Sequence, residues 1–254
     1  MKILVCVKQV VTLPGPVVML EGNSDIDSLY SRRRLNEWDE YAVEEALRIC
    51  ESSDGGEVVA VTVGPEAASE ALRKCLAMGA HRATRIWGSD VQPHDPLSVA
   101  RALAHVAGSE SADLILCGVQ SKDASQQATG PALASALGQA CVTMATDLEV
   151  FASEGRAIVH REASGGITEV VEADLPAVIT VQTGINSPRP ASFKAVMMAK
   201  KAPISVVDPG DAARSRIQML GVSLKAATRD QLQMIEGEPA DIAAKIKDLV
   251  REAS

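Results

Sequence analysis

Short apolar runs alternate with amphipathic stretches along the first 140 residues of the chain. The apolar runs cover residues 3–7, 58–63, 84–87 and 114–117, and β-branched residues are frequent in them. Runs of this length are typical of strands buried on both faces of a sheet. Between them, residues 41–50, 66–78 and 97–107 carry Ala, Leu, Val and Cys at helical spacing. The alternation predicts an α/β fold with a parallel sheet and helices on both faces.

Three segments depart from this alternation. Residues 17–35 hold two short extended stretches around Gly22, Asn23 and Ser24, which predicts a hairpin able to form a wall of a ligand pocket. Residues 147–151, 157–162 and 168–173 predict strands that either extend the sheet or cover one edge of it. Near Pro239 an amphipathic helix begins, which could dock on its own body or on a second subunit.

A buried strand predicted at residues 177–181 runs into a loop that contains Gly184, Pro188 and Pro190. Ile185 is an isolated aliphatic residue among polar neighbours in this loop. Two interpretations stay open at this point. Ile185 either folds back onto the protein's own core, as loop aliphatics usually do, or is an exposed anchor for another protein.

Composition excludes several classes of function. The formal net charge of -8 disfavours nucleic-acid binding, and an aromatic content of 2% disfavours recognition by base stacking. No apolar run is long enough to span a bilayer, and the chain begins directly with a strand, so we expect a cytoplasmic protein. The five cysteines and four histidines are scattered without metal-ligand spacing, which predicts reduced core thiols and no metal site.

Polar residues gather where the predicted strands end. Residues 118–138 join a strand to an Ala-rich helix, whose N-terminus could receive a phosphate, although a polar loop here is often simple helix capping. Lys8 and Gly64 follow two other strands, and Asn36 is a natural N-cap for the helix after the hairpin. Converging strand ends predict a nucleotide site, but neither a Walker loop nor a GxGxxG fingerprint is present. We find no catalytic constellation and predict a protein that is not an enzyme.

Four segments carry a resemblance to a known family over essentially the full length of the chain. They are ILVCVKQV, NEWDEYAVEEALRI, the pair GPEAASEALRKCLAMGAHRA and GVQSKDASQQATGP, and VHREASGGITEVVEADLPAVIT. Together they resemble the beta subunit of electron-transfer flavoproteins. The last segment closely follows the family signature and departs from it at Ser164, where the pattern usually has an acidic residue.

This resemblance implies a Rossmann-like, adenine nucleotide alpha-hydrolase-like domain at residues 1–208 and a C-terminal arm at 209–254 that contacts the partner. It implies a heterodimer in which the alpha subunit carries FAD and this subunit holds AMP. Leu13 and Trp38 match positions that approach the flavin. The family's nucleotide contacts carry over onto Cys6, Asn36, Glu37, Trp38, Asp39, Val63, Gln120, Ser121, Lys122, Asp123, Ala124, Ser125, Gln126, Gln127, Ala128, Thr129, Gly130 and Pro131.

The resemblance also implies a role for the loop near residues 183–194, which would dock on a dehydrogenase. Ile185 matches an aliphatic anchor of the family. The basic residues nearby would either form a rim that steers an acidic partner or belong to a solvated helix face. These basic residues are Arg189, Lys194, Lys200 and Lys201.

The function implied by the resemblance is that of an electron carrier, which passes electrons from an acyl-CoA-type dehydrogenase to a quinone reductase or another acceptor. Two alternatives to this function stay open. Some relatives bifurcate electrons and bind a second FAD in place of AMP. The segment ATGP resembles the FAD-type loop, but DASQQ lacks the DGDT that usually precedes it, and GINSPR resembles the AMP-type form, so we favour AMP. The other alternative is a stand-alone adenine-nucleotide-binding domain of the universal-stress type.

Overall fold

The computed structural model describes residues 1–20, 26–53, 55–89, 91–224 and 234–252. The chain separates into two compact units, Met1–Leu220 and Gly221–Ser254. Among the described residues of the second unit, the regular element is helix α6 (Pro239–Glu252), which begins where the sequence predicts it. Its Ile246 and Leu249 are about half exposed.

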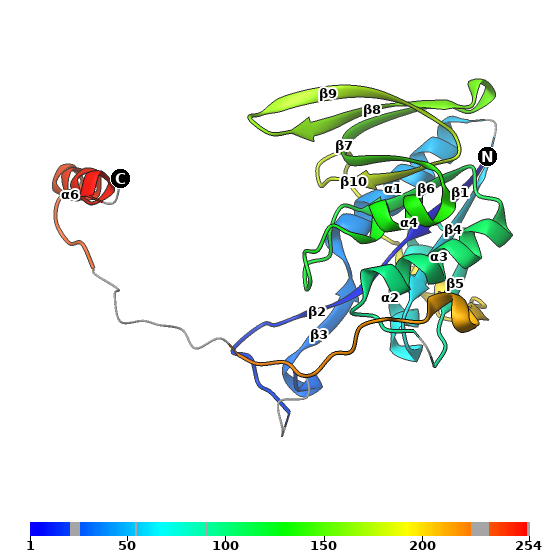
Figure 1. Ribbon diagram of the computed structural model, residues 1–254, viewed down its shortest axis with the longest axis horizontal. Helices are drawn as coiled ribbons and strands as arrows, with labels where there is room; N and C mark the ends of the chain where they lie inside the picture. Colours follow the sequence, from blue (N-terminus) through cyan, green and yellow to red (C-terminus); the bar gives the residue numbers. More distant parts are fainter. Residues whose placement is uncertain (21–25, 54, 90, 225–233, 253–254) are drawn as a thin grey trace. The chain divides into compact units, whose positions relative to one another are not determined.

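A sheet of nine strands among the described residues organises the first unit, in the order β11-β5-β4-β1-β6-β10-β7-β8-β9 (Figure 1). Strands β11 to β7 pair in parallel, while β8 and β9 continue the sheet as antiparallel strands. The predicted α/β fold class is therefore confirmed. The strands are β1 (Lys2–Cys6), β4 (Glu57–Val63), β5 (Arg82–Ile86), β6 (Leu114–Gly118), β7 (Ala140–Phe151), β8 (Arg156–Ala163), β9 (Ile167–Asp174), β10 (Ala177–Val181) and β11 (Ser205–Val207).

Both faces of the parallel region are covered by helices (Figure 1). Side chains alternate along each strand, so that Ile3 and Val5 of β1 pack toward α1 and α2 while Leu4 and Cys6 pack toward α3 and α4. A strand buried on both sides has to be apolar at every position, which explains the continuous apolar runs in the sequence. The helices are α1 (Glu37–Ser52), α2 (Ser69–Met78), α3 (Pro96–Glu110), α4 (Thr129–Leu137) and α5 (Phe193–Ala199).

Helix α3 shows how local sequence sets an element's start. Asp95 is its N-cap, and the Asp95 side chain accepts a hydrogen bond from the Leu97 N–H at 3.0 Å. Pro96 occupies the first turn, where its missing N–H costs no helical hydrogen bond. The helix therefore begins one residue before the predicted range of 97–107 and continues to Glu110.

A two-stranded antiparallel ribbon follows β1 and extends away from the main sheet (Figure 1). It pairs β2 (Gln9–Thr12) with β3 (Arg32–Leu35), and an isolated bridge joins Met19 to Ile26. The pairing thus starts before the predicted range of 17–35, because the β-branched residues at 10–12 continue the extended chain directly from β1. The predicted turn at residues 22–24 lies outside the described residues.

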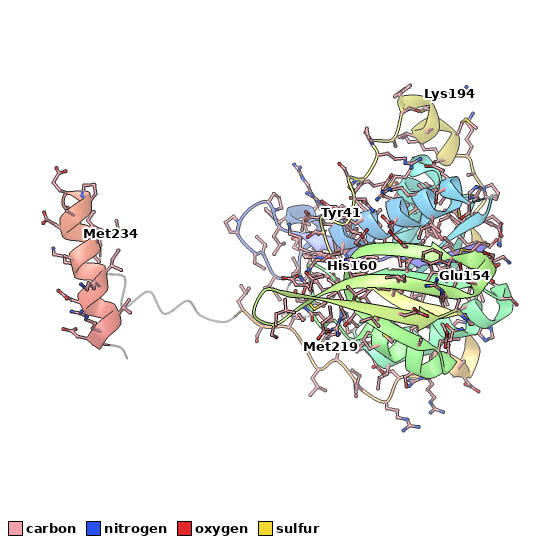
Figure 2. The ribbon with its side chains drawn as sticks, turned by 90° about the horizontal axis from the view of Figure 1, so that it is seen from above. Tyr41, Glu154, His160, Lys194, Met219 and Met234 are labelled. Carbon is pink, nitrogen blue, oxygen red and sulfur yellow. The ribbon has the colours of Figure 1, made fainter. Side chains whose placement is uncertain are left out.

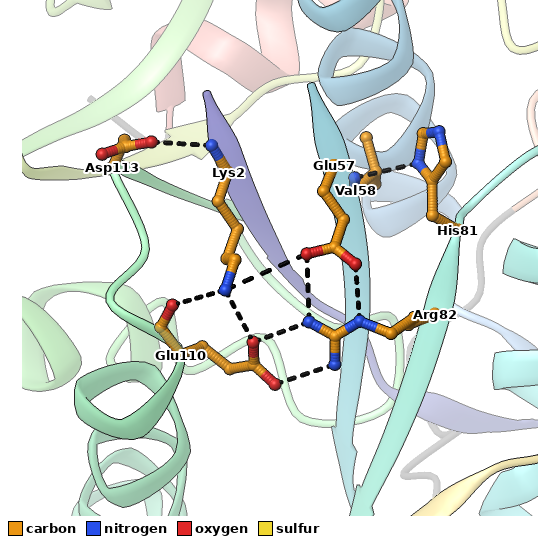
Figure 3. A network of polar contacts seen from close by, with 7 residues as sticks. All are labelled: Lys2, Glu57, Val58, His81, Arg82, Glu110 and Asp113. Atoms are coloured by element: carbon orange, nitrogen blue, oxygen red, sulfur yellow. Dashed lines mark hydrogen bonds and ion pairs between the residues drawn. The ribbon is translucent and has the colours of Figure 1, made fainter. Parts of the chain in front are cut away.

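Ion pairs tie together the strands at the amino end of the sheet (Figure 3). Arg82 of β5 contacts Glu57 of β4 at 2.6 Å and Glu110 of α3 at 2.7 Å. Lys2 of β1 reaches Glu110 at 3.1 Å, and its backbone N–H donates to Asp113 at 2.7 Å. Lys2, Glu57, Arg82 and Glu110 therefore pair their charges with one another at this end of the sheet.

A strap after β11 crosses α3 on the way to the second unit. Its 3-10 turn, η5 (Gly210–Ala213), accepts a hydrogen bond from the Ser98 hydroxyl through the Ala213 carbonyl. Arg101 donates to the Arg214 carbonyl at 2.7 Å, and Ser215 donates to Asp95 at 2.7 Å. These contacts bring Met219 to the carboxyl end of the sheet, where it lines the cavity described below (Figure 2).

Candidate functional site: a cavity at the strand ends

A cavity of about 420 Å³ lies where the carboxyl ends of β1, β4 and β6 meet the start of α4. In the sheet, β4 lies on one side of β1 and β6 on the other, so the strand order reverses direction at β1. Ligands of open α/β sheets bind at such a switch point, outside the carboxyl ends of the strands. The volume falls in the range of small-molecule sites. The residues that line the cavity are Cys6, Val7, Lys8, Gln9, Asn36, Asp39, Val63, Gly64, Pro65, Ala68, Pro93, His94, Pro96, Val99, Leu103, Cys117, Gly118, Val119, Gln120, Ser121, Ala124, Gln126, Gln127, Ala128, Thr129, Gly130 and Met219.

Two glycines let the backbone close around this cavity. A Cβ at Gly130 would lie 2.4 Å from Thr180 Cγ2, so only glycine lets the first turn of α4 pack against β10. A Cβ at Gly118 would lie 2.3 Å from Asp39 Oδ1. Because neither site leaves room for a methyl group, both glycines are required by close approach of the backbone to its neighbours.

Asp39 joins three of the segments that form the cavity. Its carboxylate accepts hydrogen bonds from the backbone N–H of Lys8 at 2.7 Å, from Asn36 Nδ2 at 3.0 Å and from the backbone N–H of Gly118 at 3.2 Å. Burial raises the pKa of Asp39 to about 7, and the three hydrogen bonds oppose that increase. The carboxylate therefore fastens the ends of β1 and β6 to the start of α1.

Asn36 does not cap its helix through its side chain, contrary to the expectation from sequence. It is almost fully buried, and its Nδ2 donates to Asp39 and, at 2.8 Å, to the Gln120 carbonyl. Its Oδ1 accepts from the Lys122 N–H at 3.1 Å. Long-range partners compete successfully with the local cap, because a buried amide needs all its hydrogen bonds satisfied. Asn36 thus holds the loop that follows β6.

Lys8 brings a positive charge to the rim of the cavity. Its Nζ lies 2.6 Å from Asp123 Oδ1 and 3.2 Å from Ser121 Oγ. Burial would raise the pKa of Asp123, but hydrogen bonds from Lys8 and Ser121 lower it overall. The pair ties the end of β1 to the loop that follows β6.

The loop between β6 and α4 has an unusual backbone. Ser125 and Gln127 adopt positive φ values of 49° and 53°, a region that residues with side chains rarely occupy. The Ser125 N–H donates to the Ser121 carbonyl at 2.8 Å, and Gln127 donates to Gln120 at 3.0 Å. Strained loop residues held by internal hydrogen bonds are often found at binding sites.

Most of the residues that the resemblance assigns to the nucleotide surround this cavity. Cys6, Asn36, Asp39, Val63 and seven residues of the loop together with Gly130 line it. Six assigned residues are not among its lining residues, namely Glu37, Trp38, Lys122, Asp123, Ser125 and Pro131.

The sequence analysis did not assign several residues that line the cavity. Gly64 and Pro65 were recognised as a strand end and could have been included. His94 precedes α3, and Met219 arrives from the strap. No local pattern marks either of them, because only long-range packing brings them to the strand ends.

Trp38 and Leu13, the residues expected near a flavin, differ in their surroundings. Trp38 is half-buried, and its indole N–H donates to Gln182 Oε1 at 2.8 Å at the end of β10. Leu13 follows β2 and is 38% exposed. Their proximity to a flavin stays a prediction.

The segment after β10 holds one partly buried aliphatic residue and several exposed apolar residues. Ile185 packs against the core on the α1 side, as the fold-back interpretation expects, and its role as an anchor for a partner stays a prediction. Phe193 of α5 is 82% exposed, and Met197 and Met198 beside it are also exposed. Lys194 points outward from α5 (Figure 2), and Lys200 and Lys201 are exposed.

Arg189, the fourth of the predicted basic residues, is engaged within the chain. It forms ion pairs with Glu44 at 2.9 Å and Glu51 at 2.5 Å. Its charge is therefore balanced locally, whereas the three lysines keep theirs at the surface.

Comparison with known proteins identifies the family. The family model described as "Electron transfer flavoprotein domain" matches residues 27–212. The chain is 39% identical over 264 residues to the electron transfer flavoprotein subunit beta of Methylophilus methylotrophus, covering 99% of this chain and 98% of that protein. This chain belongs to the electron transfer flavoprotein beta subunit family.

Two further relatives of this family span bacteria and plants. The electron transfer flavoprotein subunit beta of Bradyrhizobium diazoefficiens is 36% identical over 251 residues, covering 98% of each chain. The mitochondrial electron transfer flavoprotein subunit beta of Oryza sativa subsp. japonica is 39% identical over 213 residues, covering 83% of each chain. The resemblance predicted from the sequence is thereby confirmed.

The cavity of this electron transfer flavoprotein family member has groups that fit the phosphate end of a nucleotide. The first N–H groups of α4 lack helical partners, and Thr129 in the same turn lines the cavity. Among the described residues, none forms a cluster of His, Cys, Asp or Glu that would hold a metal ion. None of the helices in the described ranges combines the length and hydropathy that a bilayer crossing requires.

Proposed function

We propose that the chain is the beta subunit of a heterodimeric electron-transfer flavoprotein that holds AMP in the cavity at the strand ends. The alpha subunit would carry the FAD, which supplies the redox chemistry when bound. Electrons would pass from a dehydrogenase through that flavin to a quinone reductase or another acceptor. The observation that carries this proposal is the cavity, which gathers the strand ends of β1, β4 and β6 around the start of α4.

The size and lining of the cavity suit an adenine nucleotide. Its volume of about 420 Å³ lies within the range for small-molecule sites. Val99 and Leu103 of α3 and Val63 of β4 offer an apolar wall for a base. The start of α4, with Thr129, offers donors for a phosphate. The nucleotide would thus have a structural role.

The residues of this chain would bind and orient rather than make or break bonds. Asp39 and Asn36 hold the strand ends in place, and Lys8, paired with Asp123, ties the loop after β6 to the end of β1. An electron-carrier subunit needs only a cofactor that is bound, oriented and protected from solvent.

Residues 182–201, named here the docking segment, would receive the dehydrogenase. Ile185, which is partly buried, would be the aliphatic anchor of this segment, and the exposed Phe193 of α5 would add apolar contact area. Lys194, Lys200 and Lys201 would steer an acidic partner, a rate effect that salt weakens. A cytoplasmic location stays a prediction, since the relatives include a mitochondrial protein.

The first test identifies the nucleotide. The heterodimer is purified and denatured, and the released nucleotides are identified by mass spectrometry. One AMP and one FAD per heterodimer are expected. Two FAD would support an electron-bifurcating subunit, and a homodimer with ATPase activity and no flavin would support the universal-stress alternative. Either result would overturn the proposal.

A matched pair of variants tests the phosphate position. Thr129→Val removes a hydroxyl at the cavity and should lower nucleotide affinity about 10- to 150-fold, since a lost hydrogen bond to a charged group costs roughly 1.5 to 3 kcal/mol. Thr146→Val is the matched control, because its hydroxyl donates to the His160 carbonyl at 3.2 Å and Thr146 does not line the cavity. Equal affinities of the two variants would contradict the assignment.

A further inference from the structure

Two buried glutamates on α1 face the docking segment. Glu44 and Glu45 are each only 5% exposed, which is unusual for carboxylates unless they are paired. Each has a partner in the loop that follows β10, and Glu45 also pairs with Arg48 of α1 at 3.1 Å. Asn186 Nδ2 donates to Glu45 at 2.8 Å and to the Tyr41 carbonyl at 3.0 Å. The loop is therefore tied to α1 by groups far away in sequence.

Arg189 makes the most extensive of these contacts. Its backbone N–H donates to Glu44 Oε2 at 3.0 Å, while Nε and Nη2 reach the same carboxylate at 2.9 and 3.0 Å. Nη1 and Nη2 also bind Glu51 at 2.5 and 2.9 Å. A guanidinium that forks between two carboxylates is geometrically specific, and the bond to its own N–H fixes the backbone as well. Of the two carboxylates that Arg189 binds, Glu44 is buried and Glu51 is exposed.

The other end of the docking segment is held separately. Arg73 of α2 donates to the Ala199 carbonyl at 2.9 Å and to the Lys200 carbonyl at 2.8 Å. These carbonyls lie at the last turn of α5, where helical partners are lacking and a cation is favourable. Ser192 caps the first turn by accepting from the Ala195 N–H at 3.2 Å. A helix of only seven residues is marginal by itself and needs such support.

We propose that Glu44 and Arg73 are positioning residues that hold the docking segment in its binding-competent conformation before a partner arrives. This inference rests on the proposed docking function. Both residues lie outside the exposed surface of α5, so they act through Arg189 and the α5 carbonyls. Their effect follows from preorganisation: a segment that is already ordered loses less conformational entropy when a partner binds. Among the acidic residues of α1, Glu44 is the one bound to both the backbone and the side chain of Arg189.

The experiment compares heterodimer variants by amide hydrogen exchange and by electron-transfer kinetics with the dehydrogenase. Glu44→Gln should raise the exchange rate of residues 186–190 about tenfold and raise the KM for the flavoprotein about tenfold, with kcat and flavin content unchanged. Glu51→Gln is the matched control on the same helix. Glu51 is exposed and binds only the guanidinium, so an effect below threefold is expected.

Arg73 supplies the second variant in case Glu44→Gln does not fold. Arg73→Ala should speed exchange in α5 and raise the KM, and Arg73→Lys should restore most of both because a lysine can still cap the carbonyls. Unchanged exchange in both Glu44→Gln and Arg73→Ala would overturn the positioning role. Faster exchange with an unchanged KM would overturn it as well.

A separate control distinguishes failure of this inference from failure of the docking proposal. Phe193→Ala removes an exposed apolar side chain of α5 without touching the contacts of Glu44 or Arg73. If Phe193→Ala and Ile185→Ala both leave the KM unchanged, the docking segment does not bind the dehydrogenase. If they raise the KM while Glu44→Gln changes neither measurement, the docking proposal stands and the positioning role is refuted.

Discussion

The two ends of the parallel sheet use charged residues in opposite ways. At the amino end, Lys2, Glu57, Arg82 and Glu110 neutralise one another at the surface (Figure 3). At the carboxyl end, Asp39 is buried beside a cavity and is held mainly by backbone and amide N–H groups.

The difference appears in the direction of the pKa shifts. Arg82, with help from Lys2, lowers the pKa of Glu110 to about 2, although partial burial opposes this. Burial raises the pKa of Asp39 to about 7. One end therefore favours the charged form of its carboxylate, and the other disfavours it. The ion pairs at the amino end therefore stabilise the protein. At the carboxyl end, the buried carboxylate lowers the stability beside a polar cavity.

The largest expected effect concerns Asp39 and pH. Its folded pKa of about 7 exceeds the ordinary value of 3.8, so between these values the folded protein holds a proton that the unfolded chain releases. Stability should therefore fall as pH rises from 4 to 7, by about 4 kcal/mol from this group. Denaturant unfolding of nucleotide-free protein measures this slope. The slope should be clearly smaller in Asp39→Asn, because only the contribution of Asp39 is removed, and equal slopes in the two proteins would contradict the contrast between the two ends of the sheet.

Gly118→Ala should have the next largest effect. The new Cβ would lie 2.3 Å from Asp39 Oδ1 and 2.6 Å from Trp38 Cβ, so the Asp39 contacts must shift. Overpacking of this kind costs about 1 to 3 kcal/mol, and nucleotide should be lost with it. Unfolding free energies and nucleotide content are the measurements. The control is Gly108→Ala in α3, which has open space and should gain about 0.5 to 1 kcal/mol.

The smallest expected effect lies at the amino end. Glu110→Gln should destabilise the protein by about 1 kcal/mol at pH 7, since solvent screens these partly exposed pairs. Its lowered pKa means that the stabilisation is present above the ordinary pKa and is lost as pH falls from 4.5 toward 2. Unfolding at pH 7 and pH 3 measures this. Nucleotide content should stay unchanged, and its loss would show that the two ends are coupled.

Local pattern predicted the elements well and the tertiary partners poorly. The strand at 177–181 was predicted with its observed bounds, because four of its five positions are apolar and Gly184, Pro188 and Pro190 follow soon after it. Asn36 was expected to cap α1, but it binds Asp39 and the Gln120 carbonyl instead. Capping is a local preference, and a buried amide follows whatever partners the fold supplies.

The residues of the candidate site likewise fall into two groups, those that the sequence pattern could predict and those that it could not. Residues that directly follow strands were recognisable, since parallel strands must all end at one edge of the sheet. Met219 and His94 were not, because each reaches the cavity through a segment whose path depends on contacts elsewhere, such as Ser98 with the Ala213 carbonyl. Likewise, Arg189 was expected to be a basic residue of the docking segment. The sequence pattern did not predict its ion pairs with Glu44 and Glu51 of α1, which balance its charge.

The sequence by itself determined the order of strands and helices, the family, and the edge of the sheet at which a ligand would bind. These follow from periodicity, glycine and proline positions, and the geometry of parallel strands, all of which are local or topological. The tertiary structure alone decided which polar groups meet: Asp39 with the strand ends, and Glu44 with Arg189. The reason is that a buried charge takes its partner from any part of the chain that packing brings within hydrogen-bond distance, and the spacing of residues along the sequence does not encode that distance.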